Sequence, residues 1–322
     1  MNLSIEKDYL QRVYEIIKES RKTYGELKKC EFHIHTPASY DYQLIEGKLY
    51  KDLTVEEIIE YAVDIGYLSD EIKNEIIENL SYYKSEKYIN ELNENGIPFE
   101  EFKEYLAYML IAHKLYKEMI EVAIISDHNS IKGFKKLRFA LEEYYRQRIK
   151  GSENRKSVYL FLGVEISCSE QNHLIGIFND QQYDKIQEFL NEVIISENEG
   201  TYYTSQYIIE RIEKLGGLSY IAHINSSKLY GSQLYNKKLF STNMKVFGLT
   251  NLTVEERERN RLKNYNKDAS KKLGVIYEGD SHSINTLGIK NTWIKFSNID
   301  FASLRKAFQD HQINIYDASI VS

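Results

Sequence analysis

The chain has 322 residues, a formal net charge of −6, 42% hydrophobic residues and 28% charged residues. This composition is typical of a globular protein with a sizeable core, and it argues against broad electrostatic coating of nucleic acid. There is no apolar run long enough for a membrane span, no apolar signal core near the N-terminus, and only two cysteines. We therefore expect a cytoplasmic protein without a membrane partner or a disulfide framework.

The N-terminal part of the chain predicts a helix and then a strand that carries two histidines. Residues 1–29 have the pattern of a helix with a charged connection, and the following strand ends at His33 and His35. Residues two apart on a strand point to the same side, so both imidazoles would face one space and form half of a Zn, Mn or Fe site. Thr54 and Glu57 form a capping-box pattern that begins the next helix.

Residues 67–120 differ from the rest of the chain in amino-acid composition. They are rich in Glu, Lys, Asn and Tyr, and apolar residues recur with helical spacing from Phe102 to Ile120. The break before this repeat falls at Gly96 and Pro98. The pattern predicts an insertion of two or three helices that forms a cap or a partner-binding arm.

The remainder alternates between short apolar runs and amphipathic segments. The predicted strands are 122–126, 158–164, 173–178, 218–222, 244–249, 274–277 and 291–296, and the predicted helices are 132–149, 181–196, 203–215 and 254–273. Alternation of this kind favours a parallel sheet. Because reactive residues follow many different strands, we expect a closed α/β barrel that gathers these strand ends at one mouth. The whole chain, 1–322, would form one domain with a C-terminal extension at 297–322.

Six of the eight histidines lie at or beside predicted strand ends, and three carboxylates share that position. A single histidine is usually a hydrogen-bonded core or surface residue, but six in equivalent places argue for a shared role. His113 and His311 lie in helix-like contexts instead. Nine candidate ligands are too many for one ion and suit two or three ions that share a bridging carboxylate. The nine are His33, His35, Asp41, His128, Glu165, His173, His223, Asp280 and His282.

Five short motifs, taken in order, resemble those of the PHP family, the polymerase and histidinol phosphatase phosphoesterases. They are His33-Ile34-His35-Thr36, Ser126-Asp127-His128-Asn129, Gly163-Val164-Glu165, Ala222-His223 and Gly279-Asp280-Ser281-His282. The resemblance implies a distorted (β/α)7 TIM-like barrel that holds a trinuclear Zn, Mn or Fe site. It also implies that His33, His35, Glu165 and Asp280 hold one ion. Asp41, His128, His173, His223 and His282 would complete the other two, with Glu165 as a bridge.

The chain departs from the family pattern at two positions. Glu31 stands where the family usually has Asp, and Ile224 follows His223 where Pro is usual. We expect Glu31 to affect how the ligands are oriented. We expect Ile224 to affect the conformation of the loop after the strand at 218–222.

The resemblance implies a metal-dependent phosphoesterase in which a hydroxide that bridges the ions attacks phosphorus. The expected catalytic residues are His33, His35, Glu165, Asp280, His282 and Asp127. Asp127 would orient His128 or a water, or alternatively cap the next helix. Lys132, Asn225 and Ser226 are candidate substrate contacts, with a solvated helix start or loop as the alternative. The substrate could be a nucleic acid or nucleotide, which we favour, or a small phosphomonoester as in histidinol phosphatase.

A narrower resemblance links residues 35–41 and 299–308 to PHP domains that precede AAA- or SMC-like ATPases, some of them in bacterial anti-phage defence. The sequence contains no G-x-x-x-x-G-K-[ST] phosphate loop. An ATPase partner would therefore be a separate polypeptide or lie outside this sequence. The alternative function is a regulatory or scaffold subunit that docks such an ATPase through residues 67–120.

Overall fold

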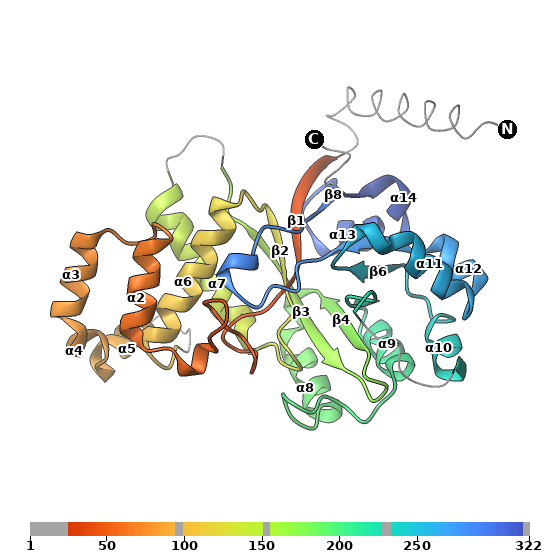
Figure 1. Cartoon of the computed structure of the whole chain (residues 1–322), viewed down its shortest axis with the longest axis horizontal. Coiled ribbons are helices and arrows are strands. Elements are labelled where there is room, and N and C mark those ends of the chain that lie inside the picture. Colours follow the sequence, from red (N-terminus) through yellow and green to blue (C-terminus); the bar gives the residue numbers. More distant parts are fainter. Residues whose placement is uncertain (1–24, 94–98, 151–154, 227–232, 318–322) are drawn as a thin grey trace.

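The computed structural model describes residues 25–93, 99–150, 155–226 and 233–317. Within these ranges nine strands form one sheet that nearly closes into a barrel, in the order β7-β6-β5-β4-β3-β2-β1-β8-β9, with helices packed around it (Figure 1). The strands are β1 (Glu26–Ile34), β2 (Val122–Ile125), β3 (Tyr159–Ser167), β4 (His173–Phe178), β5 (Leu218–Ile221), β6 (Val246–Leu249), β7 (Gly274–Tyr277), β8 (Thr292–Phe296) and β9 (Ile315–Asp317).

The prediction of a parallel sheet is wrong for β4, β8 and β9. Strands β1, β2 and β3 run parallel, as do β5, β6 and β7, but β4 is antiparallel to both of its neighbours. A short turn joins β3 to β4, so Ser167 lies opposite His173 in the register. The reversal brings the first residue of β4 to the mouth where the parallel strands end. A histidine at the start of a strand can therefore join residues from the ends of the others.

The chain after β7 pairs with the end of β1. Ser281 donates its N–H to the carbonyl of His33 at 2.9 Å, and His35 donates to the carbonyl of Ser281 at 3.0 Å. Ile34 and Ser281 form an isolated parallel bridge. Because β1 and this segment pair directly, the Gly279–His282 motif lies beside the His-x-His motif.

The helices agree with the predicted segments over most of the described chain. They are α2 (Val55–Asp64), α3 (Asp70–Glu78), α4 (Leu80–Tyr83), α5 (Glu86–Asn93), α6 (Phe102–Lys117), α7 (Lys132–Tyr144), α8 (Tyr183–Val193), α9 (Ser205–Lys214), α10 (Gln233–Leu239), α11 (Glu255–Lys263), α12 (Lys267–Lys272), α13 (Phe301–Gln309) and α14 (His311–Asn314). The capping box predicted for α2 is formed, since Thr54 and Glu57 hydrogen-bond each other's backbone N–H.

The N-terminal helix predicted for residues 1–29 falls largely on residues 1–24, outside the described part of the chain. Residues 26–29 belong to β1, so the prediction is wrong there. They pair with β8 from Glu26 to Cys30, and this ladder explains why they are extended.

The insertion contains two different kinds of helix. In α3, α4 and α5 only Ile76 is buried, and these helices form one outer end of the molecule (Figure 1). Helix α6 buries twelve of its sixteen residues and packs against α2 and α7. Helix α6 is therefore a core element of the fold, whereas residues 70–93 are peripheral, and we call them the α3–α5 arm. The role of residues 67–120 as a cap or partner-binding arm stays a prediction.

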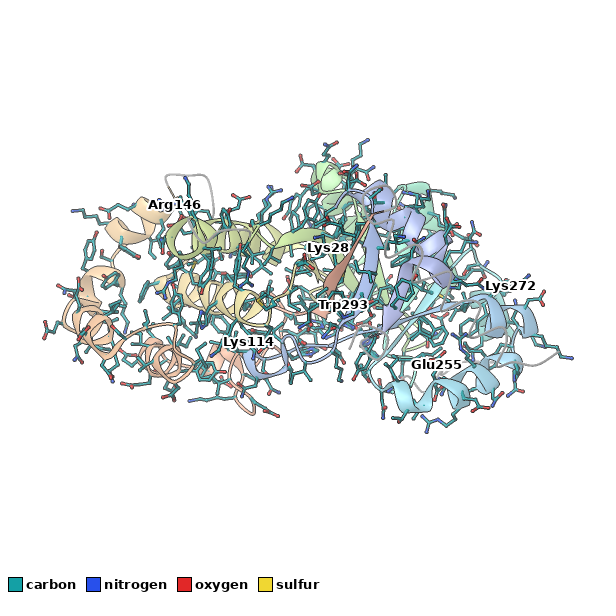
Figure 2. All side chains as sticks on the ribbon, turned by 90° about the horizontal axis from the view of Figure 1, so that it is seen from above. Lys28, Lys114, Arg146, Glu255, Lys272 and Trp293 are labelled. Carbon is teal, nitrogen blue, oxygen red and sulfur yellow. The ribbon has the colours of Figure 1, made fainter. Side chains whose placement is uncertain are left out.

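The C-terminal segment predicted as an extension completes the barrel body. Helix α13 places Phe308 against Phe32 of β1 and Tyr220 of β5, with ring centroids 6.4 and 6.5 Å apart, while β9 pairs with β8. Figure 2 shows α11 and α12, marked by Glu255 and Lys272, at the end of the molecule opposite the α3–α5 arm. None of the helices in the described ranges is long and apolar enough to span a membrane.

Candidate metal centre

The structure brings all nine candidate ligands together at the barrel mouth. They form four overlapping groups, and within each group the potential ligand atoms lie within 4.8 Å of one another. The side chains come from the ends of β1, β2, β5 and β7, from β3, and from the first residue of β4. The groups are His35, Asp41, His128 and His282; His33, Glu165 and His223; His33, His35 and Asp280; and His128, Glu165 and His173.

Two imidazoles at the mouth each lie close to the same two carboxylates. His33 Nε2 lies 3.1 Å from Glu165 Oε2 and 3.5 Å from Asp280 Oδ1. His35 Nε2 lies 3.3 and 3.6 Å from the same two oxygens. Ligand atoms that share one ion through bonds of 2.0–2.1 Å lie about 3.3 Å apart in a tetrahedral site. The four imidazole–carboxylate separations are close to this value, and Glu165 and Asp280 belong to different groups of ligand atoms.

Two further sets of atoms lie beside the first. The second carboxylate oxygen of Glu165, Oε1, is 2.8 Å from His173 Nδ1 and 3.1 Å from His223 Nε2. Asp41 Oδ2 is 3.3 Å from His128 Nε2 and 3.2 Å from His282 Nε2. Because its two oxygens face different sets, Glu165 has the position of a bridging carboxylate.

The ligand atoms fit bound cations better than they fit one another. Six buried nitrogen and oxygen atoms of these residues lack any hydrogen-bond partner in the described part of the chain: His33 Nε2, His35 Nε2, Asp41 Oδ1, His128 Nδ1, Glu165 Oε2 and His223 Nδ1. Buried polar atoms are normally paired, and exceptions need an explanation. Imidazole and carboxylate lone pairs that face each other repel unless a positive charge lies between them. Four of the six lie together, since His33 Nε2, His35 Nε2 and His128 Nδ1 are 3.0–3.3 Å from Glu165 Oε2. These four atoms fit a divalent ion.

The electrostatics of the cluster keep its carboxylates ionised. Burial would raise the pKa of Glu165, but His33 and His128 hold it well below its usual range. Burial also opposes ionisation of Asp280, and His33 more than compensates, so the pKa of Asp280 is lowered. Burial, with help from the charge of His282, lowers the pKa of His35 to about 4. Burial opposes protonation of His33, but the charges of Glu165 and Asp280 outweigh this effect, so the pKa of His33 is raised. In the metal-free protein a proton on this imidazole therefore supplies the positive charge that a bound cation would supply.

Three of the candidate ligands have left-handed backbone conformations. The φ angles are 66° at His33, 28° at His223 and 50° at Asp280. Non-glycine residues rarely adopt such angles, and each costs about 1–3 kcal/mol when the surroundings enforce it. The register of β1 also shifts between Glu31 and Ile34, at His33. The barrel therefore holds strained backbone where the ligand atoms converge.

Asp127 lies beneath the cluster and belongs to none of the four groups. Its carboxylate accepts the backbone N–H of Thr36 at 2.7 Å and the hydroxyl of Ser39 at 3.0 Å. Burial raises the pKa of Asp127 to about 6. The predicted catalytic role is not supported by this placement, because the carboxylate fastens the loop after β1 instead of facing the mouth.

The three predicted substrate contacts are all engaged within the protein. The Lys132 ammonium pairs with Glu197 at 2.8 Å on the surface. The Asn225 amide exchanges hydrogen bonds with Thr250, and the Ser226 hydroxyl donates to the carbonyl of His223 at 2.9 Å. The structure thus gives Asn225 and Ser226 a role in shaping the loop after β5, and it gives no support for substrate binding by these three residues.

The two positions at which the chain departs from the family pattern have supporting roles. Glu31 is buried outside the four ligand groups, accepts the Ser281 hydroxyl at 3.1 Å, and burial raises its pKa to about 8. Ile224, which replaces the usual Pro, donates its N–H to the carbonyl of Gly248 at 2.9 Å. A proline could not make this bond.

Sequence reasoning missed two side chains that contact the ligands directly. Glu278 is fully buried and lies 3.2 Å from His33 Nδ1. The Ser39 hydroxyl lies 2.9 Å from His35 Nδ1 and accepts the backbone N–H of His128 at 3.0 Å. A signal for Glu278 existed in the alternation of positions 278, 280 and 282. Ser39 lies in a loop, where no periodicity indicates which side chains turn inward.

Comparison with known proteins identifies a relative and a shared fold. No family model matches the chain. An uncharacterised protein of Streptococcus pneumoniae serotype 4 is 30% identical over 244 residues, which cover 72% of this chain and 86% of that protein.

Two solved structures of endonuclease Q also resemble this chain. The lesion-specific endonuclease PfuEndoQ of Pyrococcus furiosus matches with a TM-score of 0.53 and 13% identity, over 88% of this chain and 56% of that one. The chain thus spans just over half the length of that endonuclease. An endonuclease Q complex with a 27-mer duplex that carries an abasic lesion matches with a TM-score of 0.42 and 16% identity, over 62% of this chain and 51% of that one. At these identities the first match shows a common fold.

Proposed function

We propose that this chain, which belongs to the same family as the uncharacterised pneumococcal protein, is a metal-dependent hydrolase of phosphoester bonds. The observation that carries the proposal is the convergence of nine ligand side chains in four overlapping groups, two of which share Glu165. The resemblance of the motifs to the PHP family and the fold shared with the Pyrococcus endonuclease support it.

The separations between ligand atoms support an assignment of three ions. His33, His35, Glu165 and Asp280 would hold the first, which we call ion A. Glu165, His173 and His223 would hold ion B, and Asp41, His128 and His282 would hold ion C. Divalent ions in such a cluster polarise the phosphoryl oxygens and lower the pKa of water at the site.

Differences in exposure indicate how a substrate would approach. His33, His35 and Glu165 are inaccessible to solvent, whereas the side chains of Asp41 and Asp280 are 35% and 31% exposed. The open side of the cluster is therefore lined by the four most exposed ligands, Asp41, His173, Asp280 and His282. Tyr40, which is 45% exposed, has its ring centroid 5.2 Å from that of His128. We expect this ring to contact the organic part of the substrate.

We propose a nucleic acid or nucleotide as the substrate class. The fold shared with a lesion-specific endonuclease supports this choice, and the exposed Tyr40 ring offers a face on which a base could stack. A small phosphomonoester is the alternative. Action as the effector of an ATPase-linked anti-phage system would be compatible with either substrate, and it is the finer part of the proposal.

A pure scaffold subunit is less consistent with the structure. Burying atoms of ionisable groups without a hydrogen-bond partner destabilises a fold unless ions compensate them. A protein that served only to dock a partner would gain nothing from six unpaired buried atoms on the ligand side chains.

The test is an activity screen combined with elemental analysis. The purified chain would be assayed with Mn²⁺ or Zn²⁺ on an aryl phosphate, a dinucleotide, single-stranded DNA and RNA, and its bound metals would be counted. We expect about three ions per chain and cleavage of the dinucleotide or an oligonucleotide. Cleavage of the aryl phosphate alone would favour the small-substrate alternative. Failure to cleave any of the four with metal bound would refute the hydrolase.

A further inference from the structure

One buried carboxylate behind the cluster contacts two of its ligands at the same time. Glu278 Oε2 lies 3.2 Å from His33 Nδ1, and Glu278 Oε1 accepts the backbone N–H of His223. The hydroxyl of Tyr220 donates to Oε2 at 2.8 Å. All three contacts are made by a residue with no solvent exposure.

The main chain and its neighbours hold Glu278 rigidly in this place. Its N–H donates to the carbonyl of Leu249 at 3.0 Å, and the next N–H, that of Gly279, donates to the carbonyl of Phe32 at 3.0 Å. The backbone is therefore pinned between β6 and β1. The Glu278 carboxylate fills the space beside Gly248, where an added Cβ would overlap it. The carboxylate is thus in close contact with the main chain of Gly248 as well as with its hydrogen-bond partners.

The contacts with His33 and His223 bear on two different ions of the proposed cluster. A carboxylate can only accept from His33 Nδ1, so Nδ1 carries the proton and the lone pair of Nε2 is left for ion A. His223 is held at its unusual φ of 28° while it donates its N–H to Glu278, and its Nε2 then lies 3.1 Å from Glu165 Oε1, at the site of ion B.

The ligands of ion C stand apart from this carboxylate. Asp41, His128 and His282 form their ion pairs with one another, with Glu165 and with Asp280. The three side-chain hydrogen bonds that bind Glu278 run instead to His33, Tyr220 and His223. Glu278 therefore supports the sites of A and B directly and the site of C only at a distance.

We infer that Glu278 is a positioning residue that sets the ligands of ions A and B together, through the ring of His33 and the main chain of His223. This inference rests on the proposed function, since it needs the cluster to hold metal. According to this inference, binding of ions A and B depends on the buried Glu278 carboxylate, and binding of ion C does not. Removal of a hydrogen-bonding partner from a metal ligand typically lowers metal affinity by about 10–100-fold.

The experiment is Zn²⁺ binding to the whole chain, measured by competition with a chelating dye after the metal has been stripped. We expect the native protein to bind three ions. Glu278→Gln should lose about 10–100-fold in affinity at two of them and keep the third unchanged. The glutamine amide presents one acceptor oxygen, so it can satisfy His33 or His223 but not both. Gly248→Ala, which displaces the carboxylate without altering its charge, should weaken the same two sites.

The control is Glu258→Gln on α11. Glu258 is also a buried carboxylate, but it pairs with Arg257 and Arg261 on the outside of the barrel. The Glu258→Gln variant should bind three ions with native affinity. The thermal unfolding midpoint of each metal-free variant would show whether any change reflects loss of the fold. If Glu278→Gln does not fold, Gly248→Ala and Tyr220→Phe carry the same test.

The outcomes separate the two proposals. Native affinity for all three ions in both Glu278→Gln and Gly248→Ala would overturn the positioning role and leave the proposed function intact. Equal weakening of all three ions would also overturn it, because a general structural defect has that effect. A native protein that binds no Zn²⁺ would overturn the proposed function, and the inference with it.

Discussion

Thr36 donates both its backbone N–H and its hydroxyl to the carboxylate of Asp127, at 2.7 and 2.8 Å. The hydroxyl of Ser39 adds a third donor at 3.0 Å and also contacts the ring of His35. Asp127 therefore acts on a candidate ligand only through the loop that follows β1. Its importance should appear in stability as much as in activity.

Asp127→Ala should lower the free energy of unfolding of the metal-free protein by about 3 kcal/mol. It leaves three donors on Thr36 and Ser39 without an acceptor in a buried place, and each such group costs about 1–3 kcal/mol. Urea unfolding followed by circular dichroism measures this. Asp127→Asn keeps one acceptor oxygen and should lose less. Unchanged stability with abolished activity in both variants would instead indicate a direct catalytic role.

His33→Ala and Asp280→Ala should each reduce phosphoesterase activity by about a hundredfold or more. Loss of a residue that hydrogen-bonds a metal ligand typically lowers metal affinity or activity by about 10–100-fold, and loss of a ligand should lower them at least as much. Metal content, measured by elemental analysis, should fall in the same preparations. The matched control is His113→Ala in α6. The His113 imidazole lies outside the ligand groups and contacts the Tyr144 hydroxyl at 2.8 Å. Full activity in either ligand variant would remove that residue from the site.

Removal of metal should lower the thermal unfolding midpoint. Ions that bind the folded state alone add about 4 kcal/mol of stability at a concentration about a thousand times the dissociation constant. They would also relieve the repulsion among the unpaired lone pairs of the cluster. Thermal scans with and without a chelator would show the shift, and the Asp280→Ala variant should show a smaller one. Identical midpoints in the native protein would contradict metal binding by these residues.

Replacement of residues 70–93 by a short Gly-Ser linker should leave metal binding and cooperative unfolding intact. Of the residues in α3, α4 and α5, only Ile76 is buried. Tyr83 and Tyr88 pack on Phe102 of α6. Extending the deletion through α6 should abolish folding, because α6 lies in the core and its Tyr108 hydroxyl contacts Thr36. Circular dichroism and metal counts distinguish the two deletions. Loss of metal from the shorter deletion would mean that the arm shapes the mouth.

The strands and helices of the barrel were predictable because burial imposes periodicity on sequence. The predicted strand boundaries at β4 and β7 agree with the structure, and the others differ by a few residues. The reversed direction of β4 was not predictable from periodicity, which carries no information about strand direction. The core role of α6 was also missed, since a helix buried on most sides has a weak polar–apolar rhythm.

The candidate ligands were predictable because histidine and carboxylate pairs repeat at strand ends. The residues that orient them were not, since their partners are far apart in the sequence. Glu278 meets His33 across 245 positions, and Ser39 meets Asp127 across 88. Such pairings follow from barrel closure. The contacts predicted at Lys132 and Asn225 stay predictions, and the structure pairs these side chains with Glu197 and Thr250.

The reversed strand β4 also bears on the order in which the chain assembles. Glu165 and His173 belong to one hairpin and are only eight residues apart, so they can meet within microseconds of collapse. His33 and Asp280 meet only when the first and last thirds of the polypeptide come together, which is the slowest kind of encounter for a folding chain. A folding chain would thus bring two candidate metal ligands together before His33 and Asp280 meet, and binding of an ion to these two would favour completion of the barrel.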